Sequence, residues 1–333
     1  MSLRISLERI AAAEKTIAAH VTRTPSVISD GLSSHLGRRT ALKLENLQRC
    51  GCFKARGIVN KLASLSDAER SKGLITVSGG NHGIAIASIA RTMGIAATVV
   101  MPEAAPARSK ARVEADGARL ILAADAAIAF EIAEENRRAG LTYIHGYDDP
   151  VIIEGHGTLG LEFIRDVPEL TDVLVSIGGG GLISGVATAM KAVNPNLRIW
   201  GVETEGANCM SRALAEGRPV GIKPSSIVTT LGAPTATERT LEHVKALVEH
   251  VFVVSDAEAV AGVLALAEWA KIWAEPAAGC LVPAARQVID RVGTEGVLGL
   301  VVCGGNATFD DVQRWSQASI GSVERTMRIP ASR

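Results

Sequence analysis

The sequence predicts an α/β fold in which two doubly wound, mostly parallel sheets form two domains that face a cleft. Short apolar runs alternate with helical patterns along almost the whole chain, which favours parallel sheets covered by helices on both faces. The apolar runs also fall into two groups along the chain. With 333 residues, 47% of them hydrophobic, the chain can bury one large core or two moderate ones.

The first group of elements begins with an amphipathic helix over Leu7–Val21 and a short strand over Ala41–Leu44. A second helix begins near Lys54 and continues over Ile58–Leu65. Compact apolar runs then predict buried strands at Leu74–Val77, Ala97–Met101, Leu120–Leu122 and Leu141–Ile144.

The second group repeats the pattern. Its predicted strands are Val173–Ile177, Arg198–Val202, Val251–Val254 and Val297–Val302, and a helix is expected over Leu182–Lys191. We expect residues 1–65 and 147–333 to form a large domain and residues 66–146 a small one.

Composition excludes several classes of partner. The 35 basic and 35 acidic side chains cancel, so no basic field attracts nucleic acid or an anionic membrane surface. The apolar stretch near Ile84–Met101 is interrupted by Arg91, and the first residues lack the apolar region of a signal peptide. Five scattered cysteines suggest no disulfide framework. A small-molecule partner and a cytoplasmic location are therefore expected.

A run of four glycines follows one predicted strand and precedes a predicted helix. These are Gly178, Gly179, Gly180 and Gly181. Glycines let the backbone approach a ligand closely, and the N–H groups at a helix N-terminus suit a phosphate. The alternative is a tight turn without a ligand. No Lys-Ser/Thr pair follows, so a P-loop is not expected, and the spacing does not fit a dinucleotide-binding G-x-G-x-x-G turn.

Two further segments end predicted strands. The loop Ser78-Gly79-Gly80-Asn81-His82 opens a helix, and its N–H groups suit a carboxylate. The alternative is a helix N-cap formed by Ser78 or Asn81. Cys303 ends the last strand, where side chains tend to face a ligand crevice, although a buried cysteine is more often a small apolar core residue.

Lys54 follows Phe53 at the start of a predicted helix. Taken alone, such a lysine is a surface residue. A phosphate-binding turn, a carboxylate-binding loop, a polar atom at a strand end and one lysine are together what pyridoxal phosphate and an amino acid require. The combination therefore predicts a pyridoxal-phosphate enzyme, and a binding protein without catalysis is the weaker alternative.

These motifs carry a resemblance that runs from Arg23 to Asn306. The chain resembles the fold-type-II pyridoxal-phosphate enzymes, whose fold is that of the tryptophan synthase β subunit, and within them the threonine/serine dehydratase and serine racemase branch. It is also similar to the hydroxyectoine-utilisation dehydratase group. The motifs that occur in the family's order are Leu42-Lys43-Leu44-Glu45-Asn46-Leu47-Gln48, Phe53-Lys54-x-Arg56-Gly57, the Ser78–His82 loop, the four glycines and Glu275-Pro276-Ala277-Ala278.

The resemblance implies a role for each site residue. Lys54 would form an imine with the cofactor and later act as a base, and Phe53 would pack against the cofactor ring. Asn81 would bind the ring hydroxyl, Cys303 the pyridine nitrogen, and Gly178 to Gly181 the phosphate. Ser78, Gly79, Gly80, Asn81, His82 and Tyr147 would bind the substrate. The family also implies a homodimer.

The implied reaction is β-elimination of water from a β-hydroxy amino acid, which gives a keto acid and ammonia. Racemases of this branch carry a serine where this chain has Gly79, which speaks against racemisation. His156 stands in place of a glutamine, and Thr229-Thr230 in place of Asp-Gly. These departures keep modified substrates open, such as 3-hydroxyaspartate or a hydroxyectoine-derived amino acid. A β-replacement synthase is a further alternative.

The family's divalent-cation site maps to Glu203, the backbone of Ala207, and Cys209. Cys209 replaces an aspartate. Mg²⁺ and Ca²⁺ prefer oxygen ligands, so a thiol at this position weakens the site. Tight binding of a divalent cation is therefore not expected.

Overall fold

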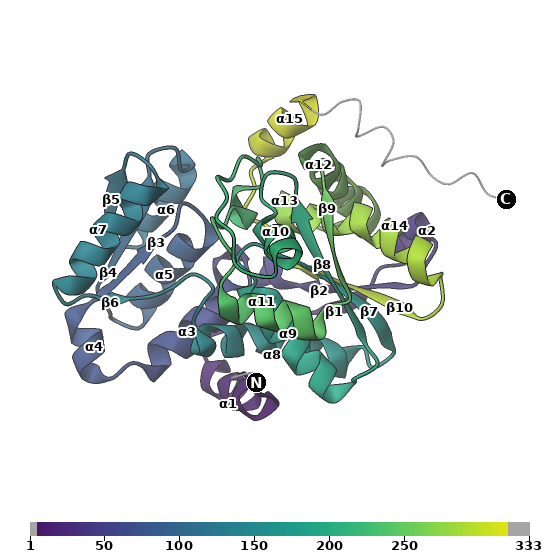
Figure 1. The fold of residues 1–333 in the computed structure, drawn as a ribbon, viewed down its shortest axis with the longest axis horizontal. Helices are drawn as coiled ribbons and strands as arrows, with labels where there is room; N and C mark the ends of the chain where they lie inside the picture. The colour runs from purple at the N-terminus through teal and green to yellow at the C-terminus, as the bar shows by residue number, and fades with distance from the viewer. Residues whose placement is uncertain (1–4, 319–333) are drawn as a thin grey trace.

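The computed structural model describes residues 5–318 and confirms the predicted α/β fold. Figure 1 shows two lobes side by side, each built around its own sheet. The lobe on the left contains β3 to β6, and the lobe on the right contains the remaining strands.

The larger sheet has six strands in the order β1-β2-β10-β7-β8-β9, and all neighbours are parallel except β1 and β2. The strands are β1 (Ser26–Ile28), β2 (Thr40–Leu44), β7 (Leu170–Ser176), β8 (Arg198–Thr204), β9 (His250–Val254) and β10 (Val297–Val302). All residues of β2 and β10 are buried. The last strand of the described residues, β10, therefore lies inside the sheet, between β2 and β7.

The smaller sheet has four parallel strands in the order β5-β4-β3-β6. They are β3 (Leu74–Val77), β4 (Ala97–Pro102), β5 (Arg119–Ala123) and β6 (Thr142–Tyr143). Successive side chains of a strand point to opposite faces. Accordingly, Leu74 packs into a core that includes Ile86 of α5, and Ile75 packs with Ala129 of α7 on the other face.

The helices cover both sheets. The α-helices of the first half are α1 (Leu7–Ile17), α2 (Asp30–Leu36), α3 (Lys54–Ser64), α4 (Asp67–Lys72), α5 (Asn81–Thr92), α6 (Ala107–Ala115), α7 (Ala126–Arg138) and α8 (Pro150–Asp166). Those of the second half are α9 (Gly181–Val193), α10 (Cys209–Glu216), α11 (Glu238–Leu247), α12 (Asp256–Ala265), α13 (Pro276–Gly279), α14 (Leu281–Val292) and α15 (Phe309–Ala318). The described residues also include short 3₁₀ turns (Glu45–Leu47, Arg49–Gly51, Thr229–Leu231) and a π-helical turn (Leu266–Ala270).

The predicted elements correspond to observed ones, with differences at their ends. The first helix was expected to reach Val21 but ends at Ile17, where a turn follows in which the N–H of His20 bonds to the carbonyl of Ile17 at 2.8 Å. The edge strand β1 was not predicted. It has three residues and follows Pro25, so it has almost no apolar pattern to detect. The division into domains at residues 65/66 and 146/147 stays a proposal.

Among residues 5–318, no helix is both long enough and apolar enough to span a membrane.

Candidate active site

A cavity of about 400 Å³ is lined by residues of both lobes. The carboxyl ends of parallel strands are where α/β sheets present their ligand-binding residues. All residues predicted to bind cofactor or substrate line this cavity, namely Phe53, Lys54, Ser78 to His82, Tyr147, Gly178 to Gly181 and Cys303. The chain thus brings together segments that lie far apart in the sequence.

Lys54 is the first residue of α3, and its side chain reaches into the cavity. Its Nζ donates a hydrogen bond to the carbonyl of Gly146 at 2.7 Å and lies 5.0 Å from the centre of the Phe53 ring. The N–H of Phe53 bonds to the carbonyl of Cys303 at 3.0 Å, which ties the start of α3 to the end of β10. Burial lowers the pKa of Lys54 to about 8, so far more of the amine is neutral near physiological pH than in an exposed lysine.

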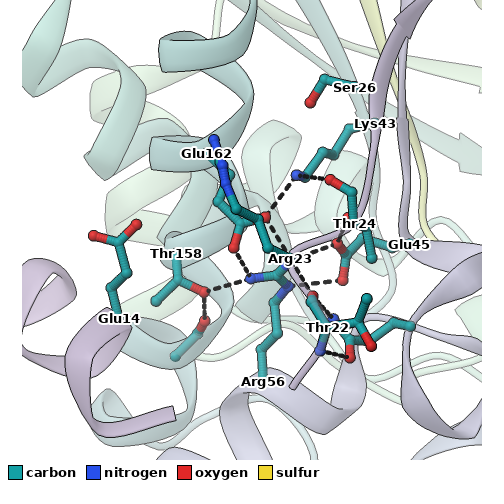
Figure 2. Close-up of polar contacts among 12 residues, drawn as sticks. Glu14, Thr22, Arg23, Thr24, Ser26, Lys43, Glu45, Arg56, Thr158 and Glu162 are labelled. Carbon is teal, nitrogen blue, oxygen red and sulfur yellow. Dashed lines mark hydrogen bonds and ion pairs between the residues drawn. The ribbon is translucent and has the colours of Figure 1, made fainter. Parts of the chain in front are cut away.

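Arg56, two residues after Lys54 in α3, belongs to a buried cluster of charged side chains that holds this helix in place (Figure 2). Arg56 is fully buried and donates to both oxygens of Glu45 and both oxygens of Glu162, each at 2.8 Å. Lys43 donates to Glu162 at 2.6 Å. Burial alone would raise the pKa of Glu45, but the guanidinium of Arg56 keeps it below its ordinary value. Two buried cations thus face two carboxylates, and the cluster fixes β2, α3 and α8 relative to one another.

The four glycines form the turn between β7 and α9. A Cβ on Gly179 would overlap the ring of Tyr147, and Gly180 has a φ of 91°, which favours glycine. The first N–H groups of a helix have no partner within it, so the start of α9 offers free donors and positive potential. The hydroxyl of Tyr147 donates to the carbonyl of Thr235 at 3.0 Å. This turn has the backbone geometry and the donors that a phosphate needs.

The predicted carboxylate loop connects β3 to α5. The N-cap of α5 is Gly80, with no side-chain cap, so the alternative that Ser78 or Asn81 caps this helix is wrong. The hydroxyl of Ser78 accepts from the N–H of Gly80 at 3.2 Å. Burial lowers the pKa of His82 to about 3, so this imidazole is neutral and uncharged beside Lys54.

Cys303 directly follows β10, where it is 3% exposed. The hydroxyl of Ser176, at the end of β7, lies 3.4 Å from its sulfur. Burial raises the pKa of Cys303 to about 12, so the thiol keeps its proton at neutral pH. A neutral thiol is a weak hydrogen-bonding partner and cannot act as the counter-charge that a carboxylate would provide.

Three cavity or near-cavity residues were given no role from the sequence. Glu275 accepts from the amide nitrogen of Asn81 at 2.8 and 3.1 Å, and Asn306 donates to the amide oxygen of Asn81 at 2.8 Å. The ring of His145 lies 4.7 Å from that of Tyr147. Asn306 closes the Cys303-Gly304-Gly305 turn and Glu275 precedes a helix-starting proline, so their positions at element ends were the available signals.

The candidate cation ligands lie outside the cavity lining. The oxygens of Glu203 accept from the N–H groups of Met210 and Ser211 at 2.8 Å each, so this carboxylate caps the start of α10. Burial raises the pKa of Glu203 to about 7. The thiol of Cys209 points to the carbonyl of Gly178 at 3.5 Å. Within residues 5–318, no three His, Cys, Asp or Glu residues gather in a way that could hold a metal ion.

Fold and cavity together define a cofactor-dependent enzyme, and residues 17–304 match the family described as pyridoxal-phosphate dependent enzyme. The chain belongs to this family, and its cofactor is pyridoxal phosphate. The resemblance to the pyridoxal-phosphate enzymes is thereby confirmed, while the likeness to the hydroxyectoine-utilisation dehydratase group stays a prediction.

Individual members of the family are similar to this chain over most of its length. The chain is 37% identical over 317 residues to an L-threonine ammonia-lyase of Thermotoga maritima, which covers 93% of this chain and 78% of the relative. It is 39% identical over 323 residues to a catabolic L-threonine dehydratase of Staphylococcus aureus, and this match covers 92% of this chain and 91% of the relative. Among solved structures, maize serine racemase superposes with a TM-score of 0.87 at 32% identity. The superposition covers 97% of this chain and 99% of the maize chain.

The residues present fit this cofactor. A glycine turn at a helix N-terminus suits its phosphate, and Lys54 is an amine with a lowered pKa that can react with its aldehyde. Phe53 provides an apolar ring surface beside Lys54. Cys303 provides a neutral donor and acceptor, which suits a pyridine nitrogen without a full counter-charge.

Proposed function

We propose that this enzyme is an ammonia-lyase of the dehydratase type, which removes water from a β-hydroxy amino acid and releases a keto acid and ammonia. The observation that carries the proposal is Lys54, whose amine lies in the cavity with a pKa lowered to about 8. The names of the two relatives, a threonine ammonia-lyase and a threonine dehydratase, support the same reaction. Bound pyridoxal phosphate supplies the electron-withdrawing group that acidifies the substrate Cα–H.

The chain's own residues then have defined tasks. Lys54 accepts the proton from Cα, because its neutral amine is the strong base of the cavity. The loop of Ser78, Gly79 and Gly80 binds the substrate carboxylate through its N–H groups. Gly79 offers no side chain to return a proton from the opposite face. Proton removal from one face therefore leads to loss of the β-hydroxyl rather than to inversion at Cα.

The cavity favours a substrate with an uncharged side chain. Among the described residues that line it, Lys54 is the only lysine or arginine, and both histidines, His82 and His145, have pKa values lowered by burial. A second carboxylate, as in 3-hydroxyaspartate, would be buried here without a cationic partner. Threonine, serine and larger neutral β-hydroxy amino acids are the substrates that we propose.

The test is a substrate panel with the purified holoenzyme. L- and D-threonine, serine, phenylserine and 3-hydroxyaspartate are each incubated with the enzyme, and keto acid and ammonia are quantified. We expect equal amounts of both products from a neutral substrate. Racemisation is followed in the same reactions by chiral chromatography. Products absent with every substrate, or inversion faster than elimination, would overturn the proposal.

The Lys54→Ala variant serves as the control for the chemistry. It should lack the visible absorption band of the cofactor and the elimination activity together. A band that is independent of Lys54 would contradict its role.

We also propose that the enzyme is a cytoplasmic homodimer. The support is the family's habit of forming dimers and the five free cysteines, which suit a reducing compartment. Light scattering coupled to size exclusion measures the mass directly; a monomer at micromolar concentration would exclude the dimer.

A further inference from the structure

The cavity contains a buried carboxylate to which the proposed reaction assigns no task. Glu275 is 4% exposed and precedes α13. Among residues 5–318, no lysine or arginine forms an ion pair with it: Arg108, the cation that acts on it from a distance, pairs with Asp311 at 2.8 Å. Burial raises the pKa of Glu275, and hydrogen bonds from the amides of Asn81 and Asn306 and from the Thr230 side chain oppose this shift.

Those amides fix one another's orientation. The side-chain nitrogen of Asn306 donates to the carbonyl of Cys50 at 2.8 Å, and that carbonyl can only accept. The same nitrogen lies 2.8 Å from the amide oxygen of Asn81, so this oxygen must be the acceptor. The amide nitrogen of Asn81 consequently faces Glu275.

Asn81 is thereby left with one free donor. Its nitrogen approaches the two oxygens of Glu275 at 2.8 and 3.1 Å, which one N–H can satisfy by sharing. The second N–H remains for a ligand in the cavity that Asn81 lines. Without Glu275, the nitrogen of Asn81 loses its acceptor, and only the bond from Asn306 to the Asn81 oxygen opposes rotation of this amide.

Glu275 is itself held by the same turn. It accepts from the backbone N–H of Asn306 at 3.2 Å, and its own N–H bonds to the carbonyl of Gly304 at 3.1 Å. Arg108, in α6, donates to the carbonyl of Asn306. Two helices of the smaller-sheet lobe, α5 and α6, therefore meet this turn of the other lobe.

We propose that Glu275 is a positioning residue that locks the amide of Asn81 so that it presents an N–H, and not its oxygen, to the ring hydroxyl oxygen of pyridoxal phosphate. The inference rests on the proposed cofactor role of Asn81. It gives the buried carboxylate a task that a purely structural residue would not have, because the effect depends on one oxygen atom of the cofactor.

The test compares two ligands on the apoprotein. Dissociation constants are measured by tryptophan fluorescence for pyridoxal phosphate and for its 3-deoxy analogue, which lacks the ring hydroxyl. In Glu275→Gln, one of the two carboxylate oxygens becomes an NH2 group. Since both oxygens face the amide nitrogen of Asn81, a donor then opposes a donor whichever way the new amide is turned. We expect affinity for pyridoxal phosphate to fall about tenfold, in the range of a lost hydrogen bond, and affinity for the analogue to stay unchanged.

Glu154→Gln is the matched control. Glu154 is also a buried glutamate whose pKa is raised by burial, but it pairs with Arg9 and lies outside the cavity lining. This variant should bind both ligands as the wild type does. If Glu275→Gln does not fold, judged by circular dichroism, Glu275→Asp replaces it, since the shorter side chain withdraws the carboxylate from the nitrogen of Asn81 and should show the same selectivity.

Equal losses for both ligands, or none for either, would overturn the inference. So would a wild type that binds both ligands equally well, because Asn81 would then make no use of the ring hydroxyl. Each of these results leaves the dehydratase proposal standing if the substrate panel gives keto acid and ammonia. Failure of the wild type to bind pyridoxal phosphate through Lys54 would instead count against the proposed function itself.

Discussion

At the scale of single residues, the site depends on a lysine whose environment changes its chemistry. The amine of Lys54 lies in the cavity, near the ring of Phe53 and the thiol of Cys303, and contacts one carbonyl. Such a neighbourhood disfavours the charged ammonium. The same lysine at the surface would be almost fully protonated and a poor nucleophile.

Capture of the cofactor by the apoprotein should therefore depend on pH with a midpoint near 8, the pKa of Lys54. Only the neutral amine attacks the aldehyde, so the rate rises as pH increases through this value. Stopped-flow absorbance over roughly pH 6 to 11 measures it, with Lys54→Ala as the blank. A midpoint near the ordinary value of about 10.4 would show that burial does not act on this amine.

A second residue-scale prediction concerns the contact between Gly179 and Tyr147. Gly179→Ala should weaken pyridoxal phosphate binding about tenfold or more, because the new methyl group overlaps the Tyr147 ring and displaces either the ring or the turn. The double variant with Tyr147→Ala should recover part of that loss. Fluorescence titration of both variants and of Tyr147→Ala alone completes the cycle. Additive losses would mean that the two residues do not interact.

At the scale of elements, the α3 helix is the part that brings Lys54 to the cavity. Its position is set by the charge cluster of Arg56, Lys43, Glu45 and Glu162, drawn in Figure 2. Removing one member of a buried ion pair leaves an unpaired charge in the core, which is among the more damaging changes in a protein.

Arg56→Met should accordingly lower the free energy of unfolding by about 3–5 kcal/mol. Urea denaturation followed by circular dichroism measures this. Arg137 also pairs with a glutamate, Glu134, but that pair lies on the surface. Arg137→Met should leave stability unchanged within error, since exposed pairs contribute little. Equal effects of the two substitutions would show that burial of Arg56 is unimportant.

The sequence predicted some helices and strands accurately and missed others. Mostly apolar runs such as Leu74–Val77 and Val297–Val302 predicted strands with the observed bounds, because strands buried on both faces have few polar positions. The edge strand β1 lacks such a run. Cavity residues such as Lys54, Asn81 and the four glycines could be predicted because each lies in a short motif next to a predicted strand or helix. Glu275 could not be given a task, because its partners, Asn81 and Asn306, are defined only by the packing of three separate turns.

At the scale of the whole molecule, residues of both lobes line one cavity, and polar contacts cross between the lobes. Arg108 of α6 reaches Asp311 of α15, and Asn81 of α5 reaches Glu275 and Asn306. A ligand that touches residues of both lobes should stabilise the assembled state by mass action.

Saturating pyridoxal phosphate should therefore raise the melting temperature. At a concentration one hundred times its dissociation constant, the stabilisation is about 2.7 kcal/mol. Differential scanning fluorimetry compares apoprotein and holoenzyme, and Lys54→Ala should show a smaller shift. An unchanged melting temperature in the wild type would show that the cofactor does not favour the folded state.

The place of β10 in the larger sheet has a consequence for how the protein is made. This strand is the last of the sheet to be synthesised, yet it separates β2 from β7 and pairs with both. All four strands of the smaller sheet precede residue 144 and can assemble on the ribosome much earlier. The larger sheet cannot be completed until β10 has been synthesised. Until then β2 and β7 each have an unpaired edge, and unpaired strand edges promote aggregation. Cys303 directly follows β10. The cofactor site is therefore completed only when β10 has paired with β2 and β7 and has covered their exposed edges.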